Sequence, residues 1–337
     1  MKKLISLVLL MGFVFIAFPS LVLGQPIEIK VASVLPQGHC LVDACFKFKE
    51  EIEKLSGGKI VVKVFPSGQL GSGRELIEGV QMGSIQMCEH SLAPLSGFSK
   101  TFLVFNLPYL FKTREIAYEF LDSPIGEEMK RLVEKDGILV LSFWENGYRH
   151  VTNSKRPIKT PADLKGLKIR TMENPVHMEA FRQMGALPTP MAFGEVFTAL
   201  QQGVIDGQEN SYSNMYVMKF HEVQKYITDT SHFYDVTGFM INPKFFYSLS
   251  PDLQEAVKKA AKTATTFQRE RAITDDDKFR KLVAEKLQFT ELTPEERAKF
   301  AEASKGTYDV FKKEIGEENL NKILNELKKI EEARSKK

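Results

Sequence analysis

Two arginines follow short apolar segments, in positions where a guanidinium group could bind an anion. Arg149 stands in ENGYRHVT, after the apolar run GILVLSFW, and Arg170 ends the strand-like segment KIR within LKGLKIRTM. A guanidinium group presents a planar set of donors that matches a carboxylate with two parallel hydrogen bonds. From the residues alone, a solvated or internally paired arginine explains each position about as well. Carboxylate binding at Arg149 and Arg170 is therefore a hypothesis that needs support from the surrounding elements.

A polar cluster occurs twice, each time after a helix, a glycine and a short strand. The segments VQMGSIQMCEH and LQQGVIDGQEN align at a constant offset of 120 residues. The offset places Glu75 on Glu195, Gln81 on Gln201, Gly83 on Gly203, Ile85 on Ile205 and Glu89 on Glu209. Ligands of open parallel sheets bind beyond the carboxyl ends of the strands. Two such sheets facing each other would bring Glu89 and the cluster at 208–210 to one shared cleft.

The sequence lacks the motifs of common enzymes. There is no GxSxG, HExxH, GxxxxGK[ST] or CxxC, and GSGREL does not complete a dinucleotide-binding pattern. Paired catalytic carboxylates at Glu89 and Glu209 remain an alternative, which requires both groups in one cleft and a raised pKa for one of them. We expect no enzyme and no cofactor.

The amino terminus predicts export. Two lysines precede an apolar run from Leu4 to about Phe18, and small or apolar residues continue to Gly24. This pattern is typical of a signal peptide at residues 1–24, cleaved near Gly24, and the run is short for a retained anchor. Cleavage leaves 313 residues and lowers the formal net charge from +3 to +1, because two lysines are lost. A chain with a net charge so close to zero lacks the basic character expected of a nucleic-acid-binding protein.

Three cysteines are too few, and odd in number, for the disulfide framework of an exported protein. A Cys40–Cys88 pair stays open, as does a metal site built from His39, Cys40, Cys88 and His90. No tight ligand spacing supports such a site. We therefore expect small buried thiols and no metal.

Hydrophobic periodicity predicts an α/β protein. Strands are expected at 27–33, 59–65, 84–88, 137–144, 168–170 and 204–208, and helices at 41–55, 74–83, 113–121, 126–134, 176–184 and 193–202. Their alternation is typical of doubly wound parallel sheets. A run without glycine or proline from 252 to about 287 predicts a helix of about 50 Å, long enough to extend along two domains.

Several segments resemble the solute-binding proteins of TRAP transporters, the tripartite ATP-independent periplasmic carriers. The resemblance rests on GYRHVTNSKRPIKTPADLKGLKIRTM, GALPTPMAFGEVFTALQQGVIDGQEN and KFHEVQKYITDTSH, and on VFPSGQLGSGRELIEGVQMGSIQM and NLPYLF in the first half. It covers about residues 27–331. The family fold implied is a two-lobed periplasmic-binding-protein fold, in which two doubly wound α/β sheets meet at a hinge and a long helix spans both lobes.

The resemblance also implies roles for individual residues. Arg170 would grip the carboxylate of the ligand, Arg149 would be the second arginine, and Asn210 would donate a hydrogen bond to the same carboxylate. Phe193 would pack on the ligand and Glu89 would face the cleft. From spacing alone, a core aromatic is the favoured interpretation of Phe193, and a turn or helix cap is the alternative for Asn210. Proximity to these segments adds four weaker candidates: His39, Trp144, Glu173 and Tyr212.

The function implied is capture of a small organic acid by cleft closure in the periplasm and delivery to an ion-gradient-driven TRAP permease. We expect a monomer. Lobe I is expected at 25–147 with about 236–275, and lobe II at 148–235 with about 276–331. A periplasmic binding protein that serves an ABC importer or a sensor remains an alternative, and an exported enzyme is a second one.

Overall fold

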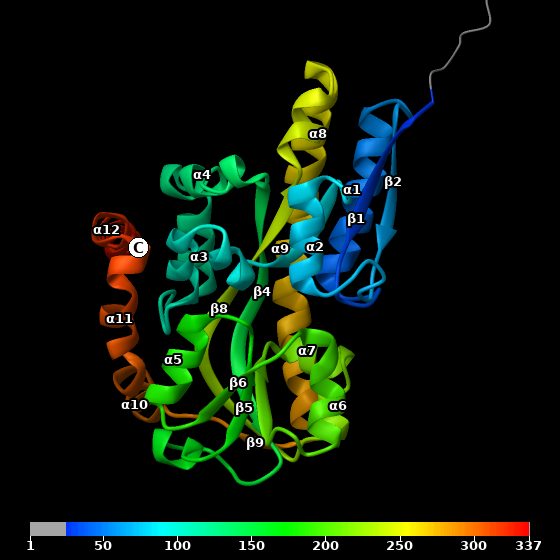
Figure 1. Ribbon diagram of the computed structural model, residues 1–337. Helices are drawn as coiled ribbons and strands as arrows, with labels where there is room; N and C mark the ends of the chain where they lie inside the picture. The colour runs from blue at the N-terminus through cyan, green and yellow to red at the C-terminus, as the bar shows by residue number, and fades with distance from the viewer. Residues whose placement is uncertain (1–24, 337) are drawn as a thin grey trace, which may run out of the picture.

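The computed structural model describes residues 25–336, which form two α/β lobes joined by two long strands (Figure 1). The expected signal peptide, residues 1–24, lies outside the described residues. Within 25–336, none of the helices has both the length and the apolar character that crossing a bilayer requires.

Lobe I begins with three parallel strands, which alternate with helices as the apolar pattern predicts. The strands are β1 (Ile27–Ala32), β2 (Ile60–Phe65) and β3 (Met87–Ser91). β1 pairs in parallel with both β2 and β3. The helices of this lobe are α1 (Cys40–Leu55), α2 (Gly73–Met82), η1 (Ala93–Gly97), η2 (Lys100–Asn106), α3 (Arg114–Leu121), α4 (Pro124–Lys130) and η3 (Glu134–Asp136).

Lobe II repeats this arrangement with shorter strands. Its parallel strands are β5 (Lys168–Thr171), β6 (Leu187–Pro190) and β7 (Gly207–Asn210), and β5 pairs with both neighbours. The other elements of lobe II are η4 (Pro161–Leu164), α5 (Pro175–Gln183), η5 (Phe193–Glu195), α6 (Val196–Gln201), α7 (Tyr212–Val217), η6 (Phe220–Glu222) and β9 (Gln288–Thr290).

Two antiparallel strands, β4 (Leu139–Asn153) and β8 (Tyr226–Ile241), run through both lobes. In lobe I β8 pairs with β3, and in lobe II β4 pairs with β7. The hydrogen-bonded order is therefore β2-β1-β3-β8-β4-β7-β5-β6, a continuous ladder in which the crossing strands connect the sheets of the two lobes. Register shifts interrupt the β4–β8 pairing between Glu145 and Gly147 and between Arg149 and Val151. Such bulges bend a strand locally, so this segment is the hinge.

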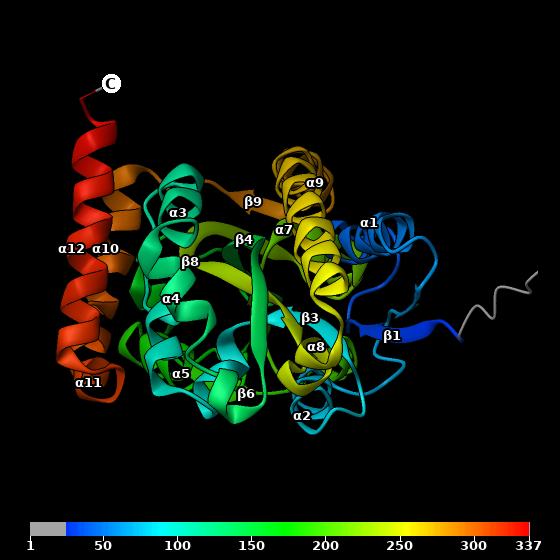
Figure 2. The same ribbon diagram turned by 90° about the horizontal axis from the view of Figure 1, so that it is seen from above.

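The long helix is α9 (Pro251–Ala284), which follows α8 (Pro243–Ser248). Its first part packs in one core with α1, through residues such as Val257 and Ala260. Its last part packs in another core with α6 and α7, through Phe279 and Val283. Figure 1 shows the helix extending along both lobes, as the sequence predicts, and Figure 2 shows it beside α1.

The carboxyl-terminal helices depart from the expected division. They are α10 (Pro294–Ser304), α11 (Gly306–Ile315) and α12 (Glu317–Arg334). The sequence placed the segment from about 276 to 331 with lobe II, but α12 packs on α3 of lobe I. Leu320, Ile323 and Leu327 join the core that contains Phe120 of that helix. The amphipathic pattern of α12 predicts a helix but does not specify which surface it covers. The chain returns to lobe I with α11, whose Phe311 and Ile315 join the same core.

Candidate functional site

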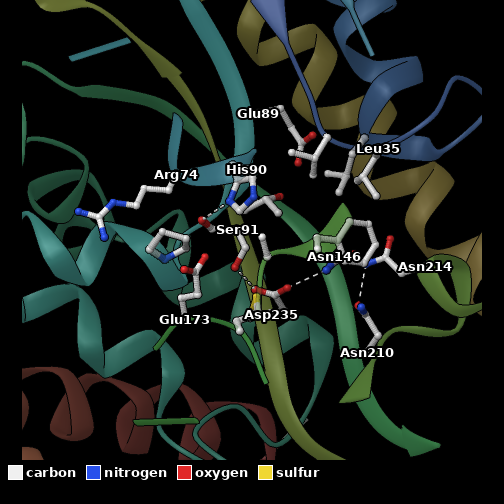
Figure 3. Close-up of a pocket in the computed structure, with 18 of the residues that line it drawn as sticks. Leu35, Arg74, Glu89, His90, Ser91, Asn146, Glu173, Asn210, Asn214 and Asp235 are labelled. Carbon is white, nitrogen blue, oxygen red and sulfur yellow. Dashed lines mark hydrogen bonds between the residues drawn. The ribbon is translucent and has the colours of Figure 1, made fainter. Parts of the chain in front are cut away.

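A cavity lies where the two lobes meet at the crossing strands (Figure 3). Lobe I contributes side chains from α2 and β3, the hinge contributes side chains from β4 and β8, and lobe II contributes side chains from β5, β7 and α7. The polar lining residues are Arg74, Glu89, His90, Ser91, Asn146, Arg149, Arg170, Glu173, Asn210, Asn214, Asp235 and Thr237. Six of the nine residues expected from the sequence are in the lining: Arg170, Arg149, Asn210, Phe193, Glu89 and Glu173.

Arg170, at the end of β5, is a buried cation without an acidic partner. Its Nε and Nη2 donate to the carbonyl oxygen of Met191 at 3.0 and 2.6 Å, and its buried Nη1 has no hydrogen-bond partner within residues 25–336. Only 2% of the residue is exposed. Burial lowers the pKa of Arg170 to about 10, so the group is still charged at neutral pH. An unpaired buried charge is costly, and Arg170 is part of the cavity lining.

Arg149 is buried as well, but every one of its donors is engaged. Nε and Nη2 bind the two carboxylate oxygens of Glu209 at 2.5 and 2.8 Å, and Nη2 also donates to the Glu209 carbonyl at 2.7 Å. Nη1 donates to Asn210 Oδ1 and to Asp235 Oδ2, both at 3.0 Å. The five N–H groups of a guanidinium are thereby used. Arg149 lines the cavity, but its hydrogen bonds hold β4, β7 and β8 together.

The amide of Asn210 is oriented by this cluster. Its Oδ1 accepts from Arg149 Nη1, from the backbone N–H of Ser211 at 3.0 Å and from Asn214 Nδ2 at 2.7 Å. Because the oxygen accepts all three bonds, the orientation of the amide is fixed. Its Nδ2 donates no hydrogen bond within the described residues, and Asn210 and Arg170 line the same cavity, so this donor is available to an anion there.

Glu89, on β3 of lobe I, is the buried carboxylate of the cavity. One oxygen accepts from Ser33 Oγ at 2.7 Å, and the residue is 1% exposed. No cation within residues 25–336 forms an ion pair with it. Burial, and secondarily the charge of Asp235, raises the pKa of Glu89 to about 7. The cavity therefore has an unpaired cation on the lobe II side and an unpaired acid on the lobe I side.

Phe193, Glu173 and Arg74 lie toward the rim of the cavity. Phe193 is half-buried, with its ring centroid 6.0 Å from the Arg170 guanidinium. Glu173 and Arg74 are exposed (Figure 3), and Arg74 Nε pairs with Glu78 at 2.8 Å. An aromatic face next to a guanidinium shields the cation from water on one side.

Three expected residues lie outside the cavity lining. Trp144 is fully buried, stacked on Phe239 at 4.4 Å, and its Nε1 donates to Thr265. Tyr212 is buried in a core of lobe II and stacks on His150 at 4.1 Å. Both side chains therefore fill the hydrophobic cores, because alternation along a strand or a helix turned them away from the cleft.

His39 is the third of these residues, and it lies one layer behind the cavity. Its Nδ1 accepts from the backbone N–H of Leu41, which caps α1, and its Nε2 lies 3.2 Å from Ser213 Oγ of lobe II. Burial lowers the pKa of His39 to about 4, so the ring is neutral. Its interaction with Ser213 connects the two lobes.

The paired-carboxylate hypothesis is wrong, because Glu209 does not line the cavity. Glu209 is fully buried behind Arg149, and His232 Nε2 lies 3.2 Å from its carboxylate. Burial alone would raise the pKa of Glu209, but the charge and hydrogen bonds of Arg149 hold it far below its usual range. A permanently ionised, enclosed carboxylate cannot exchange protons with a substrate that Glu89 touches.

No metal cluster is present within residues 25–336: three or more histidine, cysteine or acidic residues do not converge there. Cys40, Cys45 and Cys88 are all buried and free. The open alternatives of a Cys40–Cys88 bridge and of a metal site with His39 therefore receive no support from the geometry.

The sequence did not single out Asn146, Asn214 or Asp235. Asp235 of β8 accepts from Ser91 Oγ at 2.7 Å, Asn146 Nδ2 at 2.6 Å and Arg149 Nη1. Asn214 Nδ2 donates to Asn146 Oδ1 at 3.1 Å (Figure 3). The polar residues of the segment ENG within an otherwise apolar strand were a signal for Asn146. Asp235 and Asn214 carried no comparable signal.

Comparison with known proteins places this cavity in context. The family model of bacterial extracellular solute-binding proteins, family 7, matches residues 31–314. The chain is 39% identical over 236 residues to the 2,3-diketo-L-gulonate-binding periplasmic protein of Escherichia coli (strain K12), covering 70% of this chain and 72% of that protein. It is 34% identical over 301 residues to the C4-dicarboxylate-binding periplasmic protein DctP of Rhodobacter capsulatus, covering 88% and 90%.

Among solved structures, the chain resembles the sugar acid binding protein DctPAm of Advenella mimigardefordensis strain DPN7T in complex with galactonate. The TM-score is 0.88, the sequence identity is 35%, and the match covers 90% of this chain and 99% of that chain. Family match, sequence relatives and fold agree. The chain belongs to family 7 of the bacterial extracellular solute-binding proteins, the solute-binding proteins of TRAP transporters.

Proposed function

We propose that this protein captures a small organic acid in the cavity between its lobes, with Arg170 as the primary anchor of the ligand carboxylate. The observation that supports this most strongly is the buried guanidinium whose Nη1 has no protein partner. A carboxylate in the cavity would neutralise that charge and use its donors. Asn210, through its unused Nδ2, is the second donor to the same group.

The ligands of similar proteins support the class of compound. Galactonate, 2,3-diketo-L-gulonate and C4-dicarboxylates all contain a carboxylate. Arg149, Phe193, Glu89 and Glu173 would complete the binding site by lining it.

The bound acid is delivered, in this proposal, to the membrane subunits of a TRAP permease driven by an ion gradient. The protein works in the periplasm after cleavage of the signal peptide near Gly24, and as a monomer. Ligand binding favours the closed state because the ligand contacts both lobes only there. Service to an ABC importer or a sensor is the alternative, and neighbouring genes for two membrane subunits of a TRAP system would argue against it.

The test is calorimetric titration of a ligand first identified by a thermal-shift screen of organic acids, since ligands that bind the folded state raise its melting temperature. Arg170→Ala is expected to weaken binding on the order of 30-fold to several thousand-fold, because the carboxylate is then buried without a cation. Arg182→Ala is the matched control, since Arg182 lies exposed on α5 of the same lobe. Unchanged affinity of the Arg170 variant would overturn the proposal, as would turnover of the bound acid.

A further inference from the structure

Within residues 25–336, the cavity lining offers a ligand one buried cation with a free donor, Arg170. Arg149 has no donor left, because Glu209, Asn210 and Asp235 accept from all of its N–H groups. Arg74 is exposed and already paired with Glu78. Among the lining residues that the structure describes, Arg170 is therefore the buried cation that can compensate a carboxylate. A second carboxylate in the cavity would be buried without compensation.

Hydrogen-bond acceptors line the cavity from both lobes, Glu89 from lobe I and Asn214 from lobe II. Glu89 uses one oxygen for Ser33 and has a second oxygen without a protein donor in residues 25–336. Asn214 Oδ1 is buried without a partner. The orientation of that amide is fixed, because its Nδ2 donates to the oxygens of both Asn146 and Asn210. A ligand group that donates hydrogen bonds can therefore satisfy the free oxygen of Glu89 and Asn214 Oδ1.

A third unpartnered group, Thr237 Oγ1 on β8, belongs to a residue that also lines the cavity. A hydroxyl oxygen both donates and accepts. The three unsatisfied groups therefore come from three elements, β3, α7 and β8. A single ammonium group on the ligand would satisfy Glu89, but Asn214 Oδ1 and Thr237 Oγ1 would still need hydrogen-bond partners of their own. A carbon chain with several hydroxyl groups supplies a donor and an acceptor at each position.

We propose that the cavity selects a polyhydroxylated monocarboxylic acid, of the sugar-acid type, and rejects dicarboxylic acids. This rests on the proposed function, and Glu89 is its specificity-determining residue. The carboxylate of the ligand lies at Arg170 and its hydroxyl groups lie toward Glu89, Asn214 and Thr237. A dicarboxylic acid would bring its second carboxylate to these acceptors, where it meets like charge and oxygen lone pairs.

The experiment is a matched calorimetric panel on the full mature protein. The sugar acids D-gluconate, D-galactonate, D-mannonate and L-threonate are compared with the dicarboxylates succinate and adipate and the amino acids 4-aminobutanoate and 6-aminohexanoate. At least one sugar acid is expected to bind on the order of 10-fold or more tighter than every dicarboxylate and amino acid, because each unmatched polar group costs a comparable factor. A dicarboxylate that binds best would overturn the inference and leave the proposed function intact. An amino acid that binds best would overturn the choice of hydroxyl groups. Absence of binding by all four sugar acids would overturn the inference, while the wider thermal-shift screen of organic acids decides the proposed function.

A variant tests the role of Glu89 itself. Glu89→Gln keeps an acceptor for Ser33 but removes the charge, so the preference for the best sugar acid over succinate is expected to fall about 10-fold. Glu50→Gln, an exposed change on α1 of the same lobe, is the control and should leave the preference unaltered. An unchanged preference in the Glu89 variant would show that the carboxylate does not determine specificity.

Discussion

Four buried ionisable side chains line the cavity: Glu89, Arg149, Arg170 and Asp235. Arg149 is paired with both Asp235 and Glu209, while Arg170 and Glu89 have no ionic partner within residues 25–336. Buried charges in proteins are normally paired. The two exceptions face one cavity from different lobes, and this is the arrangement that a ligand with an anionic end and a donor end would complete.

Glu89 makes the stability of the unliganded protein depend on pH. Its pKa is about 7 in the folded state against an ordinary value of 4.5, so the folded state holds an extra proton between these values. The contribution of Glu89 to the free energy of unfolding is therefore fully present below pH 4.5. It is lost as the pH rises to about 7, a change on the order of 3 kcal/mol. Glu89→Gln is expected to gain stability relative to the parent protein between pH 5 and pH 8.

Urea unfolding of Glu89→Gln and of the parent protein, at pH 5 and at pH 8, measures the difference in their free energies of unfolding. Glu50→Gln serves again as the control, because an exposed carboxylate on α1 loses no solvation on folding. If the free energies of unfolding of Glu89→Gln and the parent protein differ by the same amount at pH 5 and at pH 8, the burial of an unpaired acid is contradicted.

The sequence identified residues better than it identified their partners. Arg170 was found because it ends the strand-like segment KIR, Asn210 because it ends a repeated segment, and both match a family pattern. The partner of Arg149 was not found, because Glu209 lies 60 residues away along the chain and meets it through the pairing of β4 with β7. Trp144 was misplaced for a related reason, since its position near the cleft segments says nothing about which face of β4 it occupies.

At the scale of elements, the two repeated segments form equivalent units. Gly83 and Gly203 both end a helix in the left-handed conformation, at φ values of 81° and 69°, which glycine adopts without strain. β3 and β7 then occupy corresponding places, each between a parallel strand and an antiparallel crossing strand. Glu89 and Glu209 are nevertheless used differently, because only Glu209 meets an arginine.

Gly207 tests how closely β7 must approach β4. A Cβ atom at this position would lie 2.1 Å from the carbonyl oxygen of Thr152, in backbone that cannot move without breaking the strand pairing. Gly207→Ala is expected to destabilise the protein by about 1–3 kcal/mol and to weaken ligand binding, because Asn210 ends the same strand.

Chemical denaturation and calorimetry of this variant are compared with Gly97→Ala, where a Cβ atom meets no neighbour within 4 Å. Equal stability of the two variants would show that β7 has more freedom than the structure allows.

One of the crossing strands, β4, extends beyond the segment that the sequence predicts as a strand. The apolar run predicts a strand at 137–144, but β4 continues to Asn153 through polar residues. Those residues form the hinge and the cavity wall, so they lack the alternating pattern of a half-buried strand. Their pairing with β7 and β8 is set by tertiary structure.

At the scale of the whole molecule, the lobes also meet through hydrogen bonds beside the cavity. His39 of lobe I lies 3.2 Å from Ser213 of lobe II, and Asn174 of lobe II donates to the carbonyl oxygen of Ala93 in lobe I at 2.9 Å. These contacts can form only while the two lobes lie close together. The two-lobed fold and the spanning helix α9 followed from the sequence, whereas the return of α12 to lobe I did not.

Closure predicts a change in overall size. Small-angle X-ray scattering of the mature protein is expected to show a smaller radius of gyration after saturation with a bound organic acid, because the ligand stabilises the closed arrangement. Arg170→Ala under the same conditions should keep the larger value. Identical scattering of the parent protein with and without ligand would argue against ligand-driven closure.

The most direct test of the central claim is a crystal structure of the mature protein with an acid selected from the binding screen. We predict the ligand carboxylate within about 3 Å of Arg170 Nη1, with Asn210 Nδ2 donating to the same group and Arg149 still bound to Glu209. A ligand whose carboxylate lies elsewhere, while Nη1 of Arg170 remains without a partner, would contradict the account.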